Sequence, residues 1–290
     1  MALPHHHEQR RTNRRTNSVI FLNVNAATCV VIFAYITLAW LRTVSSGKVS
    51  VMDVLWGLGF VVIAWSRALQ LESFNVITLL TLTAVSIWGI RLAVVLHQRT
   101  KHRGEDPRYV RMMESAGKNW WWISFLQVFL LQGILLVLVA LPILSLISEG
   151  NIDKSLSTNQ LIATALLIIT YGIGMIIEHR GDIELREFKK TSGPGQLKTD
   201  GIFSITRHPN HLGEAIIWWS IGGFAVLVGG FASSWALFGP LILTLLLRYV
   251  SGVAMSEVDL MEREGYQEWV ESTPAMFANP FKVLLKKNAD

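Results

Sequence analysis

The sequence predicts an all-α, polytopic membrane protein with about seven transmembrane helices. Of its 290 residues, 51% are hydrophobic and only 16% are charged, whereas about 25% of the residues of soluble domains are charged. The mean hydropathy is +0.39, and several apolar runs reach the ~20 residues that a helix needs to cross a bilayer. The eleven tryptophans suit a chain that passes several membrane–water interfaces.

The apolar runs give the expected spans in order. They cover residues 18–41, 50–69, 74–97, 121–147, 160–178, 213–230 and 233–250. The stretch 213–250 is too long for one span, and Gly229 and Gly230 in its middle favour a tight helical hairpin. Six spans with a re-entrant 213–250 region is the alternative.

The N-terminal tail and the single cysteine give little information about function. Residues 1–17 read as a basic disordered tail, in which we interpret the adjacent His5, His6 and His7 as incidental rather than as metal ligands. Residues 18–290 are expected to form one integral-membrane domain. Because Cys29 is the single cysteine, an intrachain disulfide and a cysteine-based metal site are excluded.

The distribution of Lys and Arg predicts the orientation. With seven spans, most of these residues fall in the loops around 42–49, 98–120 and 179–212 and in the C-terminal tail, all on one side. The positive-inside rule places that side in the cytoplasm, of a bacterial inner membrane or of an endoplasmic reticulum membrane, although the arginines of the N-terminal tail oppose this assignment. We interpret the net charge of +5 as topology and lipid contact, not as nucleic-acid binding.

Polar residues gather where the sixth expected span begins, in "GIFSITRHPNHLGEAIIWW" (201–219). Arg207, Asn210 and Glu214 follow each other at helical spacing and therefore share a face. Pro209 fits the first turn of a helix. The positive end of that helix would form an anion site on the cytoplasmic side; a basic helix start at the interface is the alternative.

The preceding segment "EHRGDIELREFKKTSGPGQLKTDG" repeats this pattern. Glu178, Asp182 and Arg186 recur every four residues, and Lys189 follows. Acids can accept hydrogen bonds from ribose hydroxyls or amides, and Lys189 or Arg207 can bind phosphates. A solvated helix with i,i+4 ion pairs is the alternative.

Charged residues also lie inside two earlier spans and near the C-terminus. Asp53 is expected one turn, and Arg91 two turns, inside the cytoplasmic ends of their spans, where they could pair with each other or line a polar pocket. Arg248 ends the last span and Glu257 follows it, in a segment that we expect along the interface. Four segments would thus bring polar groups to one membrane face, as in an enzyme that takes a soluble cofactor from the cytoplasm and an apolar substrate from the lipid. A transporter would rather place them at the midplane.

Common catalytic motifs are missing. No GxGxxG follows a strand, and Walker A, HExxH, GxSxG and zinc-deaminase patterns do not occur, so a Rossmann site, a metal mechanism and a nucleophile mechanism have no support.

The motif "GIFSITRHPNHLGEAIIWW" resembles the C-terminal region of the steroid 5-alpha-reductase family, in particular its bacterial branch of integral membrane proteins. The similarity extends through "GDIELREFKK", "RYVSGVAMSEVDLMEREGYQEWVESTPAMF", "MDVLWGLGF" and "WGIRL…HQRTKHRGEDPRYV", and so covers most of residues 50–282. It implies a seven-helix fold that holds NADPH in a cytoplasm-facing cavity. A hydride would then pass to an electron-poor C=C of a lipidic or steroid-like substrate taken from the bilayer.

The resemblance also suggests site residues. Asn210 and Glu214 match positions that hold the cofactor, and Asp182 matches an acid of the preceding loop. Lys189 stands where the family has an arginine, and Glu178 where steroid reductases have an asparagine. With the residues singled out above, the expected cofactor-binding set is Glu178, Asp182, Lys189, Arg207, His208, Asn210, Glu214, Arg248 and Glu257.

The catalytic positions depart from the family. Steroid reductases polarise the enone oxygen with a Tyr of the third span and a Glu of the second; here Trp88 stands for the Tyr, and the Glu has no counterpart. Trp can donate one hydrogen bond but not a proton, so Asp53, Trp88 and Arg91 are the catalytic candidates, and only Asp53 could titrate. Two alternatives remain. One is an S-adenosylmethionine-dependent methyltransferase of the isoprenylcysteine carboxyl methyltransferase type, which shares Arg-His-Pro-x-x-x-Gly; the other is a non-catalytic lipid-binding protein.

Overall fold

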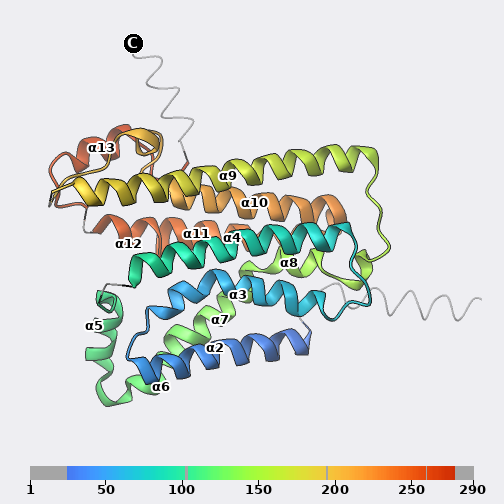
Figure 1. Ribbon diagram of the computed structural model, residues 1–290, viewed down its shortest axis with the longest axis horizontal. Coiled ribbons are helices and arrows are strands. Elements are labelled where there is room, and N and C mark those ends of the chain that lie inside the picture. The colour runs from blue at the N-terminus through green and yellow to red at the C-terminus, as the bar shows by residue number, and fades with distance from the viewer. Residues whose placement is uncertain (1–24, 102–103, 194, 259, 278–290) are drawn as a thin grey trace, which may run out of the picture. The chain divides into compact units, whose positions relative to one another are not determined.

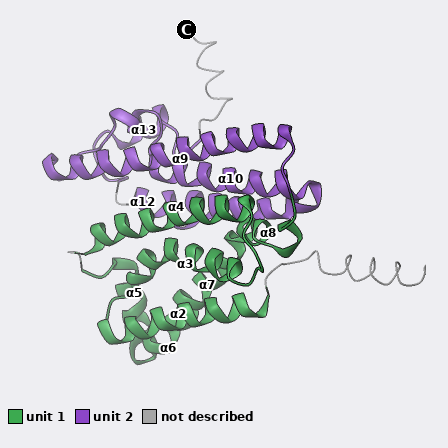
Figure 2. Ribbon diagram, turned by 45° about the vertical axis from the view of Figure 1, so that its right-hand side comes forward, with its two compact units in different colours: residues 1–154 green, residues 155–290 purple. Residues whose placement is uncertain are grey.

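The computed structural model describes residues 25–101, 104–193, 195–258 and 260–277, and every regular element in these ranges is helical. The basic tail 1–17 and its histidines lie outside them. Within these ranges, seven helical stretches are long and apolar enough to cross a membrane. They bear out the prediction of an all-α polytopic membrane protein and, by length and composition, favour seven spans over six. The chain divides into two compact units, Met1–Lys154 and Ser155–Asp290 (Figure 2).

The first unit contains four of the candidate spans. Three are single helices: α2 (Ala26–Ser46), α3 (Val51–Ala68) and α4 (Val76–Thr100). Gly57 and Gly89 allow α3 and α4 to pack backbone to backbone, because a Cβ added at Gly89 would lie 2.5 Å from the carbonyl oxygen of Gly57. Asn25 and Asn75 begin α2 and α4, since each side chain accepts a hydrogen bond from the backbone N–H three residues later.

The fourth span is segmented, where the sequence suggested one uninterrupted run over 121–147. It comprises α5 (Pro107–Ala116), η1 (Gly117–Asn119), α6 (Trp120–Ser124), a π-helical turn η2 (Phe125–Leu130) and α7 (Leu131–Val139). The part of 98–120 that was expected as a loop therefore contains a helix. A break at Ala140 separates α7 from the short, fully buried α8 (Leu141–Leu146), because Pro142 cannot continue the hydrogen bonding of the preceding helix. The turn η3 (Glu149–Asn151) follows.

The second unit is built on two long neighbouring helices, α9 (Thr158–Thr191) and α10 (Pro209–Gly229), which lie side by side in Figures 1 and 2. Ser157 and Gln160 begin α9 with a reciprocal capping box. At 34 residues and ~1.5 Å per residue, α9 is about 51 Å long. It exceeds the ~30 Å hydrocarbon core, so residues 179–191, assigned to a loop from sequence, continue the helix.

The last span follows a sharp turn, as the glycine pair predicted. α10 ends at Gly229, and Gly230 adopts a left-handed φ of 68° that other residues avoid. In the described residues after this turn, five short elements follow: η5 (Phe231–Leu237), α11 (Phe238–Leu245), η6 (Leu246–Val250), α12 (Val253–Val258) and α13 (Tyr266–Ser272). In this last segment, Val258 and Met261 are exposed whereas Tyr266 is buried.

Candidate cofactor site

The polar motif 201–219 forms the entry to α10. Pro209 occupies the first turn, as predicted, and His208 is the N-cap residue. A short 3₁₀ turn, η4 (Gly201–Ser204), precedes it. Asn210 follows in the first helical turn and is half-buried.

The residues before Pro209 are paired with the end of the C-terminal segment. Arg207 N–H donates to the Pro274 carbonyl at 2.9 Å, and His208 N–H donates to the Ala275 carbonyl at 3.0 Å. The Thr206 hydroxyl donates to the same Ala275 carbonyl at 3.1 Å. These bonds satisfy backbone groups that the helix itself cannot pair, and they fix where α10 begins.

Glu257, from α12, lies at the centre of this contact. Its Oε1 accepts from Nε and Nη2 of Arg207, both at 2.9 Å, and lies 2.9 Å from Nε2 of His208. Arg207 Nη1 donates to the carbonyls of Thr273 and Val270. Both partners are largely buried: the Arg207 side chain is 6% exposed and the Glu257 side chain 12%. We call the two paired segments, 206–208 and 273–275, together with Glu257 the clasp.

An apolar cluster supports the clasp. Phe203, Tyr266 and Trp269 form its buried centre, and Leu185 of α9 packs against them. Trp269 Nε1 donates to the Phe203 carbonyl at 3.3 Å. Burial, followed by a hydrogen bond to Glu257 and its negative charge, raises the pKa of Tyr266 to about 12. Tyr266 therefore stays neutral at physiological pH.

Three of the predicted acids lie buried on the two long helices. Glu178 and Asp182 of α9 are 2% and 8% exposed, and Glu214 of α10 is 7% exposed. Gly213 makes the close approach of the two helices possible: a Cβ there would lie 2.5 Å from the Gly174 carbonyl oxygen and 2.6 Å from the Glu178 nitrogen. Carboxylates in such surroundings are functional candidates, because burying a charged group in a membrane protein is costly.

The other two predicted cofactor residues of this unit are more open. Lys189 is exposed near the end of α9. Arg248 is half-buried, and its guanidinium carbon lies 5.2 Å from the centre of the Tyr249 ring. The structure thus joins Arg207, His208 and Glu257 directly, whereas Lys189 and Arg248 lie on other elements of the unit.

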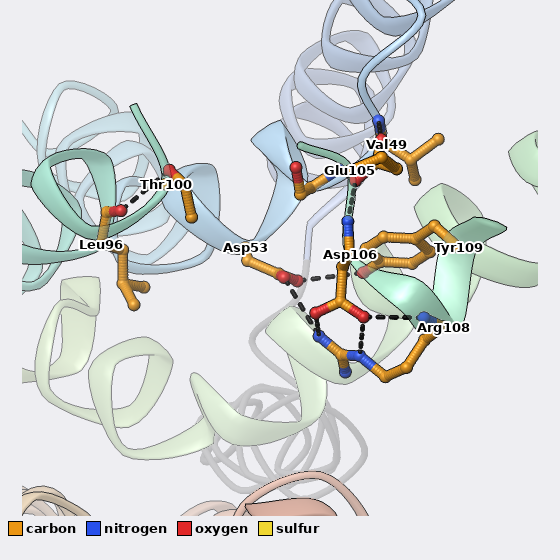
Figure 3. A network of polar contacts seen from close by, with 9 residues as sticks. Val49, Asp53, Leu96, Thr100, Glu105, Asp106, Arg108 and Tyr109 are labelled. Carbon is orange, nitrogen blue, oxygen red and sulfur yellow. Dashed lines mark hydrogen bonds and ion pairs between the residues drawn. The ribbon is translucent and has the colours of Figure 1, made fainter. Parts of the chain in front are cut away.

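In the first unit, Asp53 is the centre of a second polar network (Figure 3). It lies in the first turn of α3, as expected. Its Oδ1 accepts from the Tyr109 hydroxyl at 3.0 Å, and its Oδ2 accepts from Arg108 Nη2 at 3.3 Å. Sequence reasoning considered Arg91 as the partner of Asp53; the partners identified here are Arg108 and Tyr109, from the first turn of α5.

Two neighbouring acids fix the segment that leads into α5. Asp106 begins α5 by accepting from Arg108 N–H at 2.9 Å, and it also binds the Arg108 guanidinium at 2.8 Å. Glu105 accepts from the backbone N–H groups of Val49 and Ser50, just before α3 (Figure 3). Negative side chains are favourable at that end of a helix.

The remaining catalytic candidates lie together on α4. Trp88 is fully buried, and its ring centre lies 5.6 Å from that of Phe60 on α3. Arg91, three residues later, is half-buried. In the described part of the chain, no group of three or more His, Cys, Asp or Glu residues is arranged to hold a metal.

Sequence reasoning missed the roles of Arg108, Tyr109 and Tyr266. The position of Arg108 and Tyr109 could have been predicted, because an Asp followed by Pro107 is typical of a helix start. That signal places Arg108 and Tyr109 in a first helical turn rather than in a loop. Tyr266 had no comparable signal, since its contact with Glu257 depends on how the C-terminal segment folds back.

The Asp106 contacts predict a pH dependence of stability. The hydrogen bond from Arg108 is the main cause that lowers the pKa of Asp106 below its ordinary value of about 3.9. A lowered pKa in the folded state means that the charged carboxylate stabilises the fold above about pH 4, and that this contribution is lost as pH falls further. Asp106→Asn keeps a capping side chain and should cost about 1 kcal/mol at pH 7.

Thermal unfolding of the detergent-purified protein from pH 3 to 7 measures this effect. The melting temperature of Asp106→Asn should fall less steeply with acid than that of the wild type. Asp153→Asn, a change at an exposed aspartate, is the control. Equal acid profiles for the wild type and Asp106→Asn would contradict the assignment.

Comparison with known families gives one match. A family model described as "Protein of unknown function (DUF1295)" matches residues 39–273. The chain belongs to the DUF1295 family. The matched range includes Asp53, both long helices of the second unit and the clasp as far as Thr273, so the DUF1295 region contains the candidate residues of both units. No curated protein and no solved structure matches the chain.

Proposed function

We propose that this membrane protein is an NADPH-dependent reductase that saturates an electron-poor C=C of a lipidic substrate. The observation that carries the proposal is the arrangement at the start of α10, where buried Arg207 and His208 form one cluster with the largely buried Glu257 of α12. Glu214 is buried one turn further along α10. Buried charges of this kind are more typical of functional sites than of membrane anchors. The resemblance of this motif to steroid 5-alpha-reductases supplies the cofactor and the reaction.

The residues fit a nucleotide in a specific way. Glu178, Asp182 and Glu214 can accept hydrogen bonds from ribose hydroxyls or a carboxamide. The first-turn N–H groups of α10 and the exposed Lys189 suit phosphate oxygens. Arg207 differs from the sequence expectation, because its guanidinium donates to Glu257 and to two backbone carbonyls. We therefore assign Arg207 a positioning role rather than a phosphate contact.

The chemistry requires one hydride and one proton. NADPH, when bound, supplies the hydride that adds to the β-carbon of the C=C. The α-carbon then takes a proton, which water can supply. Asp53 and Arg91, both in the first unit, remain catalytic candidates from the sequence. Arg108 and Tyr109 orient Asp53 by holding both of its carboxylate oxygens. The buried Trp88 of α4 remains the third such candidate.

The membrane setting supports an apolar substrate. Seven apolar helices let a sterol, a polyprenoid or an unsaturated acyl chain reach the site from the bilayer. The proposal keeps the orientation expected from the positive-inside rule, with the nucleotide taken from the cytoplasm.

NADPH binding tests the proposal directly. NADPH at 100 times its Kd should stabilise the detergent-purified wild type by about 2.7 kcal/mol. Glu214→Gln should weaken NADPH binding at least tenfold, because it removes a charged acceptor. Glu187→Gln is the matched control, since Glu187 is an exposed acid on α9 paired with Lys190.

The same titration separates the alternatives. Stabilisation by S-adenosylmethionine but not by NADPH would favour the methyltransferase, which shares the Arg-His-Pro element. Stabilisation by neither compound would favour a lipid-binding protein without this chemistry. Equal NADPH affinities for the wild type and Glu214→Gln would remove Glu214 from the site.

A further inference from the structure

We propose an oxyanion-binding site at the opposite end of α3 from Asp53, built from Arg67 and the first turn of α2. Its ligand is a phosphate or carboxylate group. The site lies wholly in the first unit and does not depend on the proposed reductase activity.

Arg67 is a buried cation with weak partners. It lies in the last turn of α3 and is 7% exposed. Its two hydrogen bonds, from Nη1 to Gln70 Oε1 at 3.4 Å and from Nη2 to the Ile147 carbonyl at 3.3 Å, are long and go to neutral acceptors. Its buried Nε has no hydrogen-bond partner among the described residues. A buried charge is stable only when it is paired and hydrogen-bonded. The negative charge of Glu149 acts on Arg67, but no described acid lies in ion-pair contact with its guanidinium, so an anion in direct contact would complete the pairing.

A second buried donor is the hydroxyl of Thr28, whose backbone N–H belongs to the same polar network. Gln70 Oε1, which accepts from Arg67, also accepts from Asn25 Nδ2. Asn25 begins α2 and accepts from the Thr28 N–H at 2.9 Å. The Thr28 hydroxyl is fully buried and has no partner within the described ranges. Two unsatisfied buried donors thus come from the start of α2 and the end of α3.

The chemistry of the missing partner follows from these donors. Both groups require oxygen acceptors, the guanidinium requires negative charge, and the first turn of α2 adds the positive end of a helix dipole. Arg matches the geometry of carboxylate and phosphate groups. The exposed Gln70 side chain is the group that would move to admit the ligand. A lipid head group at this membrane face and a free anion share this chemistry.

Thermal-shift titration of the delipidated full-length protein tests the site. One arm uses dihexanoyl-phosphatidylglycerol and the other sodium phosphate, each against sodium chloride at equal ionic strength. We expect a saturable upward shift of the melting temperature in at least one arm. A shift with the lipid alone identifies a head group as the source, and a shift with phosphate alone identifies a free anion.

Matched variants show whether the anion binds at Arg67 and Thr28. Arg67→Gln should raise the apparent Kd at least tenfold and Thr28→Val several-fold. Arg42→Gln removes an exposed charge, and Thr43→Val removes a buried hydroxyl from the other end of α2; both should bind like the wild type. If Arg67→Gln does not fold, Arg67→Lys, which keeps the charge but loses Nε, should still bind more weakly.

Three results would overturn the proposal. The first is no shift of the wild type in either arm. The second is equal affinity of the wild type and the Arg67 variants. The third is an equal effect of Thr28→Val and Thr43→Val. Because NADPH is not used, failure of this experiment and failure of the reductase proposal are independent.

Discussion

Replacing Gly213 with alanine is expected to lower the free energy of unfolding by about 3 kcal/mol. The added Cβ would lie 2.5 Å from the Gly174 carbonyl oxygen, 2.6 Å from the Glu178 nitrogen and 2.7 Å from the Glu178 Cβ. Two of these atoms belong to the α9 backbone and cannot move as a side-chain tip can. α9 and α10 must therefore separate, and the buried acids Glu178 and Glu214 shift with them.

Thermal unfolding of the purified protein measures the loss of stability, and the NADPH titration measures the effect on the acids. Gly172→Ala is the matched control, because Gly172 also lies in α9 but has no atom within 4 Å of an added Cβ. Alanine is the better helix former, so the control should be as stable as the wild type or more so. Similar melting temperatures for Gly213→Ala and Gly172→Ala would show that the helices are not held at this contact.

Local sequence signals predict most of the fold. Apolar length alone identifies the spans, Pro209 marks the start of α10, and the pair at Gly229 and Gly230 marks the turn after it. These features depend on neighbouring residues and on the thickness of a bilayer. The breaks in the fourth span were not predicted, although Pro142 was a local signal for the last of them.

Polar partners are harder to predict. Glu257 is 50 residues from Arg207, and Asp53 is 55 residues from Arg108. A pairing over such distances leaves no periodic pattern in the sequence. Expected depth suggested Arg91 as a partner of Asp53, but depth gives no indication of Arg108 or Tyr109, which lie on another helix. The candidate residues could therefore be named from sequence, whereas their contacts could not.

The second large expected effect is a loss of stability when the buried acid of the clasp is replaced. Glu257→Gln should cost about 3–5 kcal/mol of stability, because Arg207 keeps its charge in a site where its counterion is gone. Arg207 and Glu257 are nearly inaccessible to water, with side chains 6% and 12% exposed, so solvent cannot replace the lost contact. His208, which also contacts the lost carboxylate oxygen, is the N-cap of α10, and NADPH affinity should fall together with stability.

A double-mutant cycle distinguishes the loss of the Arg207–Glu257 ion pair from a nonspecific loss of stability. Arg207→Gln and Glu257→Gln should each destabilise the protein, and the double variant should lose less than the sum of the two, because neither charge is then left unpaired. Glu268→Gln, an exposed change in α13 of the same segment, is the control and should melt like the wild type. Additive losses in the cycle, or a Glu257→Gln protein as stable as Glu268→Gln, would mean that the clasp is held by its backbone pairing and apolar cluster rather than by the buried charges.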